Sequence, residues 1–150
     1  GCRCRPAAQR HARPLLVGPR EAIPLAAGAA GVDGADFEIV ATGAAPPDTA
    51  ARATALMRQG VLAALMKGSL HTAELMSAVV HKTEGLRTDT RISHAFVFDL
   101  PRYHKLLALT DCVVNIAPDL RTKRDILGNA ICLLQRLGIA APKVGVVAAV

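Results

Sequence analysis

The sequence has 150 residues, 51% of them hydrophobic, which is enough for one ordinary domain with a hydrophobic core. Only 3% of the residues are aromatic and Trp is absent, so the core must be aliphatic, and stacking platforms for nucleic-acid bases are not indicated. The sequence lacks an apolar run of the ~18 residues that a membrane span requires, and residues 1–14 lack the apolar stretch of a signal peptide. We therefore expect a cytoplasmic protein without a membrane partner.

The net charge of +6 is concentrated at the start of the sequence. The first twenty residues contain no acidic residue and five arginines, which are Arg3, Arg5, Arg10, Arg13 and Arg20. The 13 basic and 12 acidic residues beyond position 20 nearly balance. This distribution is typical of a basic arm, residues 1–14, whose origin is unclear, rather than of a nucleic-acid-binding surface. We expect no nucleic-acid partner.

The four cysteines do not indicate a disulfide framework or a metal site. Cys2 and Cys4 lie in the basic arm, whereas Cys112 falls in an apolar run and Cys132 in the apolar stripe of a predicted helix. Cys2, Cys4 and His11 could together hold a metal ion, but no second ligand pair at zinc-site spacing follows. We predict free thiols, with Cys112 and Cys132 buried, and no metal.

Strands and helices alternate in the first half of the sequence. The pattern predicts a strand at 15–17, an Ala-rich helix toward Gly31, a strand at 37–41, a helix from Pro46 to Gly60, a strand at 62–66 and a helix at 71–82. Asp48 is the expected N-cap of the second helix. The run at 62–66 is continuously apolar, as in a buried strand of a parallel sheet. We predict an α/β fold with a mostly parallel sheet and flanking helices.

A polar stretch at 85–91 interrupts this pattern and indicates a junction between two domains, 15–88 and 89–150. The pattern then predicts a strand at 92–99, a turn at 100–102, a hairpin partner at 105–109, a continuation or further strand at 112–116, a helix at 119–137 and a strand at 143–150. In the 119–137 helix, apolar residues recur on one face and Gly138 follows as a stop. The apolar residues are Ile126, Leu127, Ala130, Ile131, Leu134 and Leu137.

The segment 65–72 carries the strongest sign of a binding site. An apolar run ends there, Gly68 allows a tight turn, and polar residues lead into the next helix. A helix N-terminus presents unpaired N–H groups and a partial positive charge, which suit phosphate. Lys67 would add a full positive charge, and Ser69 and Thr72 would add hydroxyl donors. The alternative is a simple cap, in which Ser69 or Thr72 caps the helix and Lys67 is solvated.

Two arginines near the junction are further candidates. Arg87 and Arg91 could reach a phosphate in a cleft between the domains, or they could be surface charges. We favour the binding role for Arg87 and the surface role for Arg91. The sequence contains no P-loop, no dinucleotide-binding fingerprint and no nucleophile elbow.

Several longer stretches resemble the phosphate acetyl/butyryltransferase family. They are LVGP near the start, LMKGSLHTAELM, GLRTDTRISHAFVFDLP, LLALTD, NIAPDLRTKRDILGNAI and APKVGVVAAV, and they occur in the family's order and spacing. The resemblance covers residues 15–150. It implies a two-domain α/β fold similar to that of the isocitrate and isopropylmalate dehydrogenases, with a cleft between the domains and a homodimer for the full-length enzyme. The chain resembles the N-terminal to middle part of such an enzyme, truncated at the C-terminus.

The resemblance implies an acyltransferase that converts acyl-CoA and phosphate into acyl phosphate and CoA, by direct attack of phosphate on the thioester. Acyl-CoA and phosphate would be its partners as substrates, and no bound cofactor is expected. Because the loop 68–72 matches a cleft-lining segment of the family, we expect phosphate or CoA at Lys67, Gly68, Ser69, His71, Thr72 and Arg87. The family's Ser-Arg pair and catalytic aspartate lie downstream of Val150. The catalytic residues are therefore unknown, and this chain alone is expected to be inactive.

Other matches to the family leave some questions open. Asn115, Pro118 and Asp119 match its Asn-x-x-Pro stretch, which we interpret as mostly structural. The acetyl branch has an arginine in the helix after the loop, where this chain has Ser77, and the form of the loop is more similar to the butyryl branch. The acyl chain length stays open. The alternative function is a non-catalytic CoA- or nucleotide-binding α/β module, and a third is an RNA-binding protein that uses the basic arm.

Overall fold

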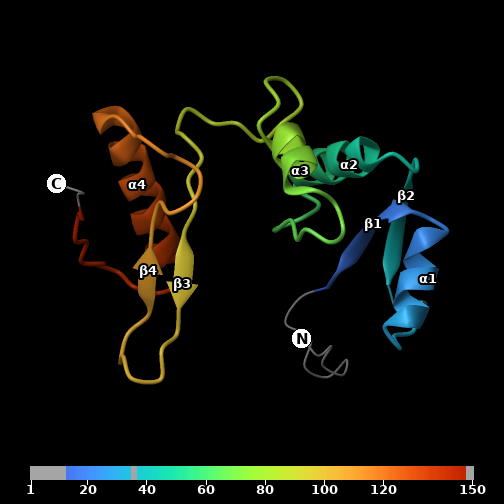
Figure 1. Cartoon of the computed structure of the whole chain (residues 1–150), viewed down its shortest axis with the longest axis horizontal. Coiled ribbons are helices and arrows are strands. Elements are labelled where there is room, and N and C mark those ends of the chain that lie inside the picture. The colour runs from blue at the N-terminus through green and yellow to red at the C-terminus, as the bar shows by residue number, and fades with distance from the viewer. Residues whose placement is uncertain (1–12, 35–36, 148–150) are drawn as a thin grey trace. The chain divides into compact units, whose positions relative to one another are not determined.

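The computed structural model describes residues 13–34 and 37–147, which form two compact units that divide between Arg87 and Thr88 (Figure 1). The first unit contains β1 (Leu15–Pro19), α1 (Ala22–Ala29), β2 (Glu38–Thr42), α2 (Pro46–Arg58) and α3 (Thr72–Val79). The second contains β3 (Phe96–Phe98), β4 (Leu107–Leu109) and α4 (Leu120–Arg136). No helix in the described ranges is both long enough and apolar enough to cross a membrane.

The first unit begins with a β-α-β arrangement, as the sequence predicts. β1 and β2 are parallel, in a register that pairs Leu15 with Glu38 and Pro19 with Thr42. The crossover between them contains α1, because parallel strands cannot be joined by a tight turn. Gly18 of β1 faces the side chain of Ile23 at the start of α1.

α2 supplies the core of the first unit. It packs against β1, β2 and α3 and buries Ala50, Thr54 and Leu56. Burying a leucine of this kind contributes about 1.5–3 kcal/mol. Pro46 opens the helix and Gly60 follows its end with a φ of +76°, as predicted. The predicted N-cap is wrong, because Ala45 is the N-cap and Asp48 lies within the first turn.

The predicted strand at 62–66 is wrong. The segment is irregular, and Met66 is 94% exposed. A strand needs a hydrogen-bonded neighbour, and the sheet described for the first unit contains only β1 and β2. The helix predicted at 71–82 ends at Val79, because the backbone of residues 80–86 folds back on it, with the Leu86 N–H donating to the Val79 carbonyl at 2.8 Å.

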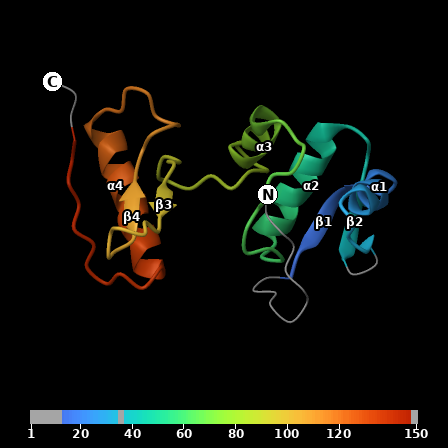
Figure 2. The ribbon, with the colours of Figure 1, turned by 60° about the horizontal axis from the view of Figure 1, so that its bottom comes forward.

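The second unit contains an antiparallel hairpin and one long helix. β3 pairs with β4, with Phe96 opposite Leu109 and Phe98 opposite Leu107. The hairpin is predicted correctly, but its strands are shorter than the expected 92–99 and 105–109. The fold class is therefore α/β with a small parallel sheet and a separate antiparallel pair rather than one mostly parallel sheet. In both Figure 1 and Figure 2, α4 runs alongside the hairpin.

Before β3 and after β4, backbone N–H groups donate to side-chain carboxylates rather than to a neighbouring strand. Before β3, the Arg91 N–H donates to the Asp125 carboxylate of α4 at 3.1 Å, so residue 91 is tied to the helix. After β4, the Asp111 carboxylate accepts from the N–H groups of residues 113, 114 and 115. The strand considered at 112–116 is therefore absent from the described chain. Residues 143–147 are also irregular, and 148–150 lie outside the described residues.

α4 matches its prediction closely. The Asp119 carboxylate caps it by accepting from the Thr122 N–H at 2.7 Å, and Gly138 follows with a φ of +91°. The face that packs inward is narrower than the predicted apolar stripe, since Leu137 is half-exposed. The buried residues are Thr122, Asp125, Ile126, Ala130 and Leu134.

The predicted burial of two cysteines is wrong. Cys112 and Cys132 are both free thiols, as predicted, but both are exposed. Cys112 lies in the loop that Asp111 organises, and Cys132 points away from the inward face of α4. Cys2, Cys4 and the basic arm up to residue 12 lie outside the described residues.

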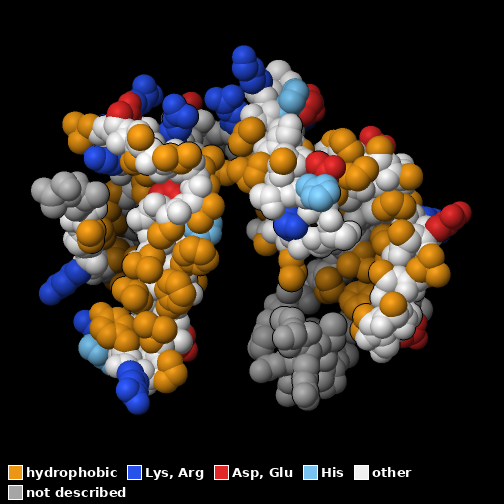
Figure 3. Space-filling model, viewed as in Figure 1, with side chains coloured by type: hydrophobic (Ala, Val, Ile, Leu, Met, Phe, Trp, Pro, Cys, Tyr) orange, Lys and Arg blue, Asp and Glu red, His pale blue; other side chains and the backbone are white. Residues whose placement is uncertain are grey.

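Large apolar side chains are exposed on the second unit. Hydrophobic side chains gather over the hairpin in Figure 3, where Phe96, Val97 and Leu109 are each 40–45% exposed. Two more lie in the connection from β4 to α4 and at the start of α4, where Ile116 and Leu120 are 98% and 85% exposed. A hairpin of this size is marginal without further packing partners.

Candidate functional site

The predicted anion-binding loop precedes α3, whose N-terminus it leads into. All six predicted binding residues are exposed, so a ligand could reach each of them. Five of the six lie in this loop or at the first residue of α3. The structure therefore brings Lys67, Gly68, Ser69, His71 and Thr72 together by sequence proximity, at the end of a helix of eight residues.

Lys67 folds back over its own loop. Its Nζ donates to the Leu70 carbonyl at 2.8 Å and lies 3.3 Å from the Gly68 carbonyl. The ammonium is therefore held at the entrance to α3 rather than extended into solvent. An ammonium has three donors, so an anion could still accept a third hydrogen bond.

The N-terminal end of α3 is capped by the side chain of Glu74, which lies in its first turn. The His71 N–H donates to the Glu74 carboxylate at 2.9 Å, and the Glu74 and Leu75 N–H groups donate to the His71 carbonyl. His71 is the N-cap, so the simple cap through Ser69 or Thr72 is wrong. The Glu74 carboxylate lies where the helix dipole favours negative charge. A bound anion would share that favourable position with Glu74.

Donors nevertheless remain at this helix end. The N–H groups of Thr72 and Ala73 lie in the first turn of α3, where the helix itself provides no carbonyl to accept from them. The Ser69 and Thr72 hydroxyls are exposed beside them. Hydroxyls, backbone N–H groups and an ammonium are the donors that bind phosphate oxygens. The loop can therefore orient an anion.

Arg87 lies at the other end of α3. The Leu86 N–H donates to the Val79 carbonyl, so the chain returns to the C-terminal end of the helix just before Arg87. Eight helical residues span about 12 Å. The structure therefore does not bring Arg87 onto the same turn as the loop.

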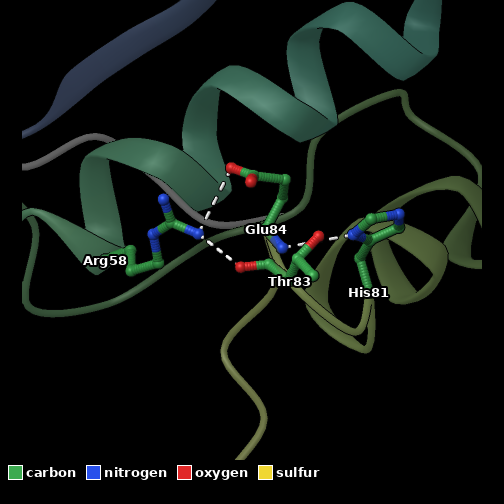
Figure 4. Close-up of polar contacts among 4 residues, drawn as sticks. All are labelled: Arg58, His81, Thr83 and Glu84. Atoms are coloured by element: carbon green, nitrogen blue, oxygen red, sulfur yellow. Dashed lines mark hydrogen bonds and ion pairs between the residues drawn. The ribbon is translucent and has the colours of Figure 1, made fainter.

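The return of the chain to α3 is held by a group of polar contacts, shown in Figure 4. Arg58 at the end of α2 donates to the Thr83 carbonyl at 2.7 Å and lies 3.2 Å from the Glu84 carboxylate. The Glu84 N–H donates to His81 Nδ1 at 3.2 Å. Sequence reasoning missed Arg58, because its partner is a backbone carbonyl 25 residues away.

In the second unit, the stretch from Asn115 to Asp119 makes hydrogen bonds that hold the local backbone. The Asn115 side-chain amide donates to the Asp111 carboxylate and to the Ile92 carbonyl. Burial raises the pKa of Asp111, but hydrogen bonds from Val113, Val114 and Asn115 outweigh this effect and lower the pKa to about 2. An aspartate that begins a turn is a recognisable sequence signal for such bonds, although it was not used in the prediction.

Asp119 also fits the structural interpretation. The hydroxyl and N–H of Thr122 lower the pKa of Asp119, and the charges of Arg91 and Arg121 lower it further. Arg91 therefore has an acidic neighbour within its own unit. The surface role that the sequence favours for Arg91 stays a prediction.

In the second unit, a hollow of about 840 Å³ lies on the first turns of α4. All of its lining residues belong to that helix, so it is a one-sided surface rather than an enclosed site. They are Leu120, Arg121, Lys123, Arg124 and Leu127. The described residues contain no group of three or more His, Cys, Asp or Glu side chains that could hold a metal ion.

The sequence matches one protein family over nearly its whole length. The family described as "Phosphate acetyl/butaryl transferase" matches residues 14–150. The chain belongs to this family. The match includes the loop before α3, Arg87 and the stretch from Asn115 to Asp119, so all three segments are segments of a phosphate acetyl/butyryltransferase sequence.

The chain is similar to curated relatives of two kinds, some named phosphate acetyltransferase and others named phosphate butyryltransferase. A phosphate acetyltransferase of Rhizobium meliloti is 52% identical over 67% of this chain and 32% of its own length. A phosphate acetyltransferase of Rickettsia felis is 44% identical over 83% of this chain and 36% of its own length. A phosphate butyryltransferase of Clostridium acetobutylicum is 37% identical over 91% of this chain and 45% of its own length. The chain therefore spans between a third and a half of these relatives.

Proposed function

We propose that the protein containing this sequence transfers an acetyl or butyryl group between coenzyme A and inorganic phosphate. Membership of the phosphate acetyl/butyryltransferase family over residues 14–150 carries this proposal. The names of relatives from Rhizobium meliloti and Clostridium acetobutylicum support transfer to phosphate. The donors that converge at the start of α3 support binding of an anionic substrate.

In the proposed reaction, a phosphate oxygen attacks the carbonyl carbon of the acyl-CoA thioester. A bond forms between that oxygen and the carbonyl carbon, the carbon–sulfur bond breaks, and CoA leaves as a thiolate that takes up a proton. The loop before α3 would hold the phosphate or the CoA pyrophosphate and orient it, and Lys67 would offset its negative charge. CoA would be a substrate rather than a resident cofactor. The groups that protonate the thiolate would come from outside residues 1–150.

Substitutions in the loop test its role. We call "the extended chain" the full-length protein that contains this sequence. In the extended chain, Lys67→Ala and Ser69→Ala should each lower kcat/KM for phosphate or CoA at least ~10-fold, which is about 1.4 kcal/mol of transition-state stabilisation. Arg20→Ala, which removes an exposed cation outside the loop, is the control. Unchanged kinetics in both loop variants would reduce the loop to a helix cap.

Further proposals concern the whole protein. By analogy with the family, it would have a cytoplasmic location, form a homodimer, and adopt a two-domain fold like that of the isocitrate and isopropylmalate dehydrogenases. Residues 15–88 and 89–150 would be parts of those two domains. Crystallography of the extended chain would test the fold, and light scattering would test the dimer. The acyl chain length is proposed only as acetyl or butyryl.

A turnover assay distinguishes the acyltransferase from the alternative, a non-catalytic CoA- or nucleotide-binding module. Both functions predict that CoA raises the melting temperature of the protein, because a ligand that binds only the folded state stabilises it. Only the acyltransferase releases the CoA thiol in a phosphate-dependent way. RNA that shifts the melting temperature while CoA does not would favour the third hypothesis, an RNA-binding protein.

A further inference from the structure

The residues between α3 and Arg87 form a compact turn, residues 80–86, which we call the exit turn. Within the turn, the Gly85 N–H donates to the His81 carbonyl at 3.2 Å, and the Leu86 N–H joins the turn to α3 by donating to the Val79 carbonyl at 2.8 Å. A Cβ atom at Gly85 would lie 2.5 Å from both of those carbonyl oxygens. The turn therefore requires glycine at this position, and its path is sterically defined.

One side chain joins the exit turn to a different element. Arg58, in the last turn of α2, donates through Nη1 to the Thr83 carbonyl at 2.7 Å, and the same nitrogen lies 3.2 Å from the Glu84 carboxylate (Figure 4). Hydrogen bonds from a charged donor are stronger than neutral ones. The Glu84 N–H also donates to His81 Nδ1, so Glu84 is held by a second contact. Thr83 adjoins Glu84 in the chain.

The same helix also packs against α3, which begins at the predicted anion-binding loop. α2 therefore contacts the helix that carries the loop and, through Arg58, the turn that leads to Arg87. Without Arg58, one backbone hydrogen bond, from the Leu86 N–H to the Val79 carbonyl, would hold the end of the exit turn on α3. We expect the turn to remain folded, with Arg87 less firmly held relative to α2 and α3.

We propose that Arg58 is a positioning residue for Arg87. It holds Thr83 and Glu84 of the exit turn on α2, and so it limits the movement of Arg87 relative to the loop at the other end of α3. This inference rests on the proposed function, because it takes Arg87 as a contact to the anionic part of CoA or to phosphate. Arg58 itself points toward the exit turn and donates its hydrogen bond there (Figure 4).

A double-mutant cycle in the extended chain tests this inference, because residues that act as one unit are not additive. Arg87→Ala should raise KM for acyl-CoA or phosphate about tenfold with little change in kcat, as expected for lost uniform binding. Arg58→Ala should raise the same KM about three- to fivefold. The double variant should be no worse than Arg87→Ala alone.

Conservative and control variants separate positioning from stability. Arg58→Lys can still donate to the Thr83 carbonyl, so it should restore at least half of the lost affinity. Arg52→Ala removes another exposed cation of α2 and should leave KM unchanged. Melting temperatures of Arg58→Ala and Arg52→Ala should differ by less than about 2 °C, since exposed ion pairs contribute little to stability.

Each contrary result has its own meaning. If the effects of Arg58→Ala and Arg87→Ala on KM multiply in the double variant, Arg58 acts independently and the inference is wrong. If Arg87→Ala leaves KM unchanged while Lys67→Ala lowers kcat/KM, the inference is wrong and the proposed function stands. If the unmutated extended chain shows neither turnover nor CoA binding, the proposed function itself fails.

Discussion

At the residue scale, Glu74 competes with any anion that binds before α3. Its carboxylate accepts from the His71 N–H at 2.9 Å and carries a negative charge at the positive end of the helix. A predicted binding loop can therefore contain an element that weakens binding. The sequence could have shown this, because a glutamate three residues after an N-cap is a known capping pattern.

Replacing Glu74 with glutamine should strengthen anion binding. The amide oxygen of the new side chain could still accept from the His71 N–H, so the cap would be kept while the charge is lost. A charge next to a helix end contributes about 0.3–1 kcal/mol, so phosphate affinity should rise about two- to fivefold. Isothermal calorimetry with inorganic phosphate measures this, with Glu21→Gln at the start of α1 as the matched control. Equal or weaker affinity in Glu74→Gln would place the anion elsewhere.

Gly85 is the second residue where one atom decides the local structure. An alanine there should destabilise the protein by about 1–3 kcal/mol, because its Cβ would overlap two backbone oxygens that have no room to move. The matched control is Gly28→Ala in α1, where no atom lies within 4 Å of the added Cβ. Gly28→Ala should be neutral or slightly stabilising, since alanine favours helix. Denaturant unfolding of both variants measures the difference, and equal midpoints would show that the exit turn can rearrange.

At the element scale, patterns that depend on one segment were predictable and patterns that depend on a partner were not. The helix at α4 and the β1–α1–β2 order follow from periodicity, a cap and glycine stops. The run at 62–66 has the composition of a buried strand, but a strand forms only where another strand accepts its hydrogen bonds. The segment 112–116 likewise has strand composition, and a single carboxylate, Asp111, takes its N–H groups instead.

The connection between β4 and α4 should therefore be sensitive to acid. The pKa of Asp111 is lowered from 3.8 to about 2, so its hydrogen bonds stabilise the folded state fully above pH ~4 and are lost as the pH falls toward 2. The loss should be at most about 2 kcal/mol, because each pKa unit corresponds to about 1.4 kcal/mol and the side chain is partly solvated.

Urea unfolding between pH 5 and pH 2 measures this dependence. Asp111→Asn should be less stable than the unmutated chain at pH 5 and should lose less stability between pH 4 and pH 2. Asp89→Asn, which removes an exposed carboxylate of the same unit, is the matched control and should retain the full pH dependence. Identical pH profiles for Asp111→Asn and the unmutated chain would show that these hydrogen bonds do not contribute.

At the scale of the whole molecule, the family is readable from the sequence and the complete site is not. The stretches that resemble the family cover residues 15–150, and the family matches residues 14–150. The chain nevertheless spans about a third of the acetyltransferase relatives. Where a site is built from segments that are distant in sequence, one of those segments alone does not predict the whole site. The loop before α3 could be predicted because its donors are close in sequence, whereas Arg58 could not, because its partner lies 25 residues away.

The most direct test of the proposed function is phosphate-dependent release of CoA with matching formation of acyl phosphate. The extended chain, supplied with acetyl-CoA or butyryl-CoA, should release thiol only when inorganic phosphate is present. ³¹P NMR should detect one acyl phosphate for each thiol. The 150-residue chain alone should bind CoA without turnover. Thiol release by the extended chain that does not depend on phosphate, or that occurs without acyl phosphate, would contradict the assignment of phosphate as the acyl acceptor.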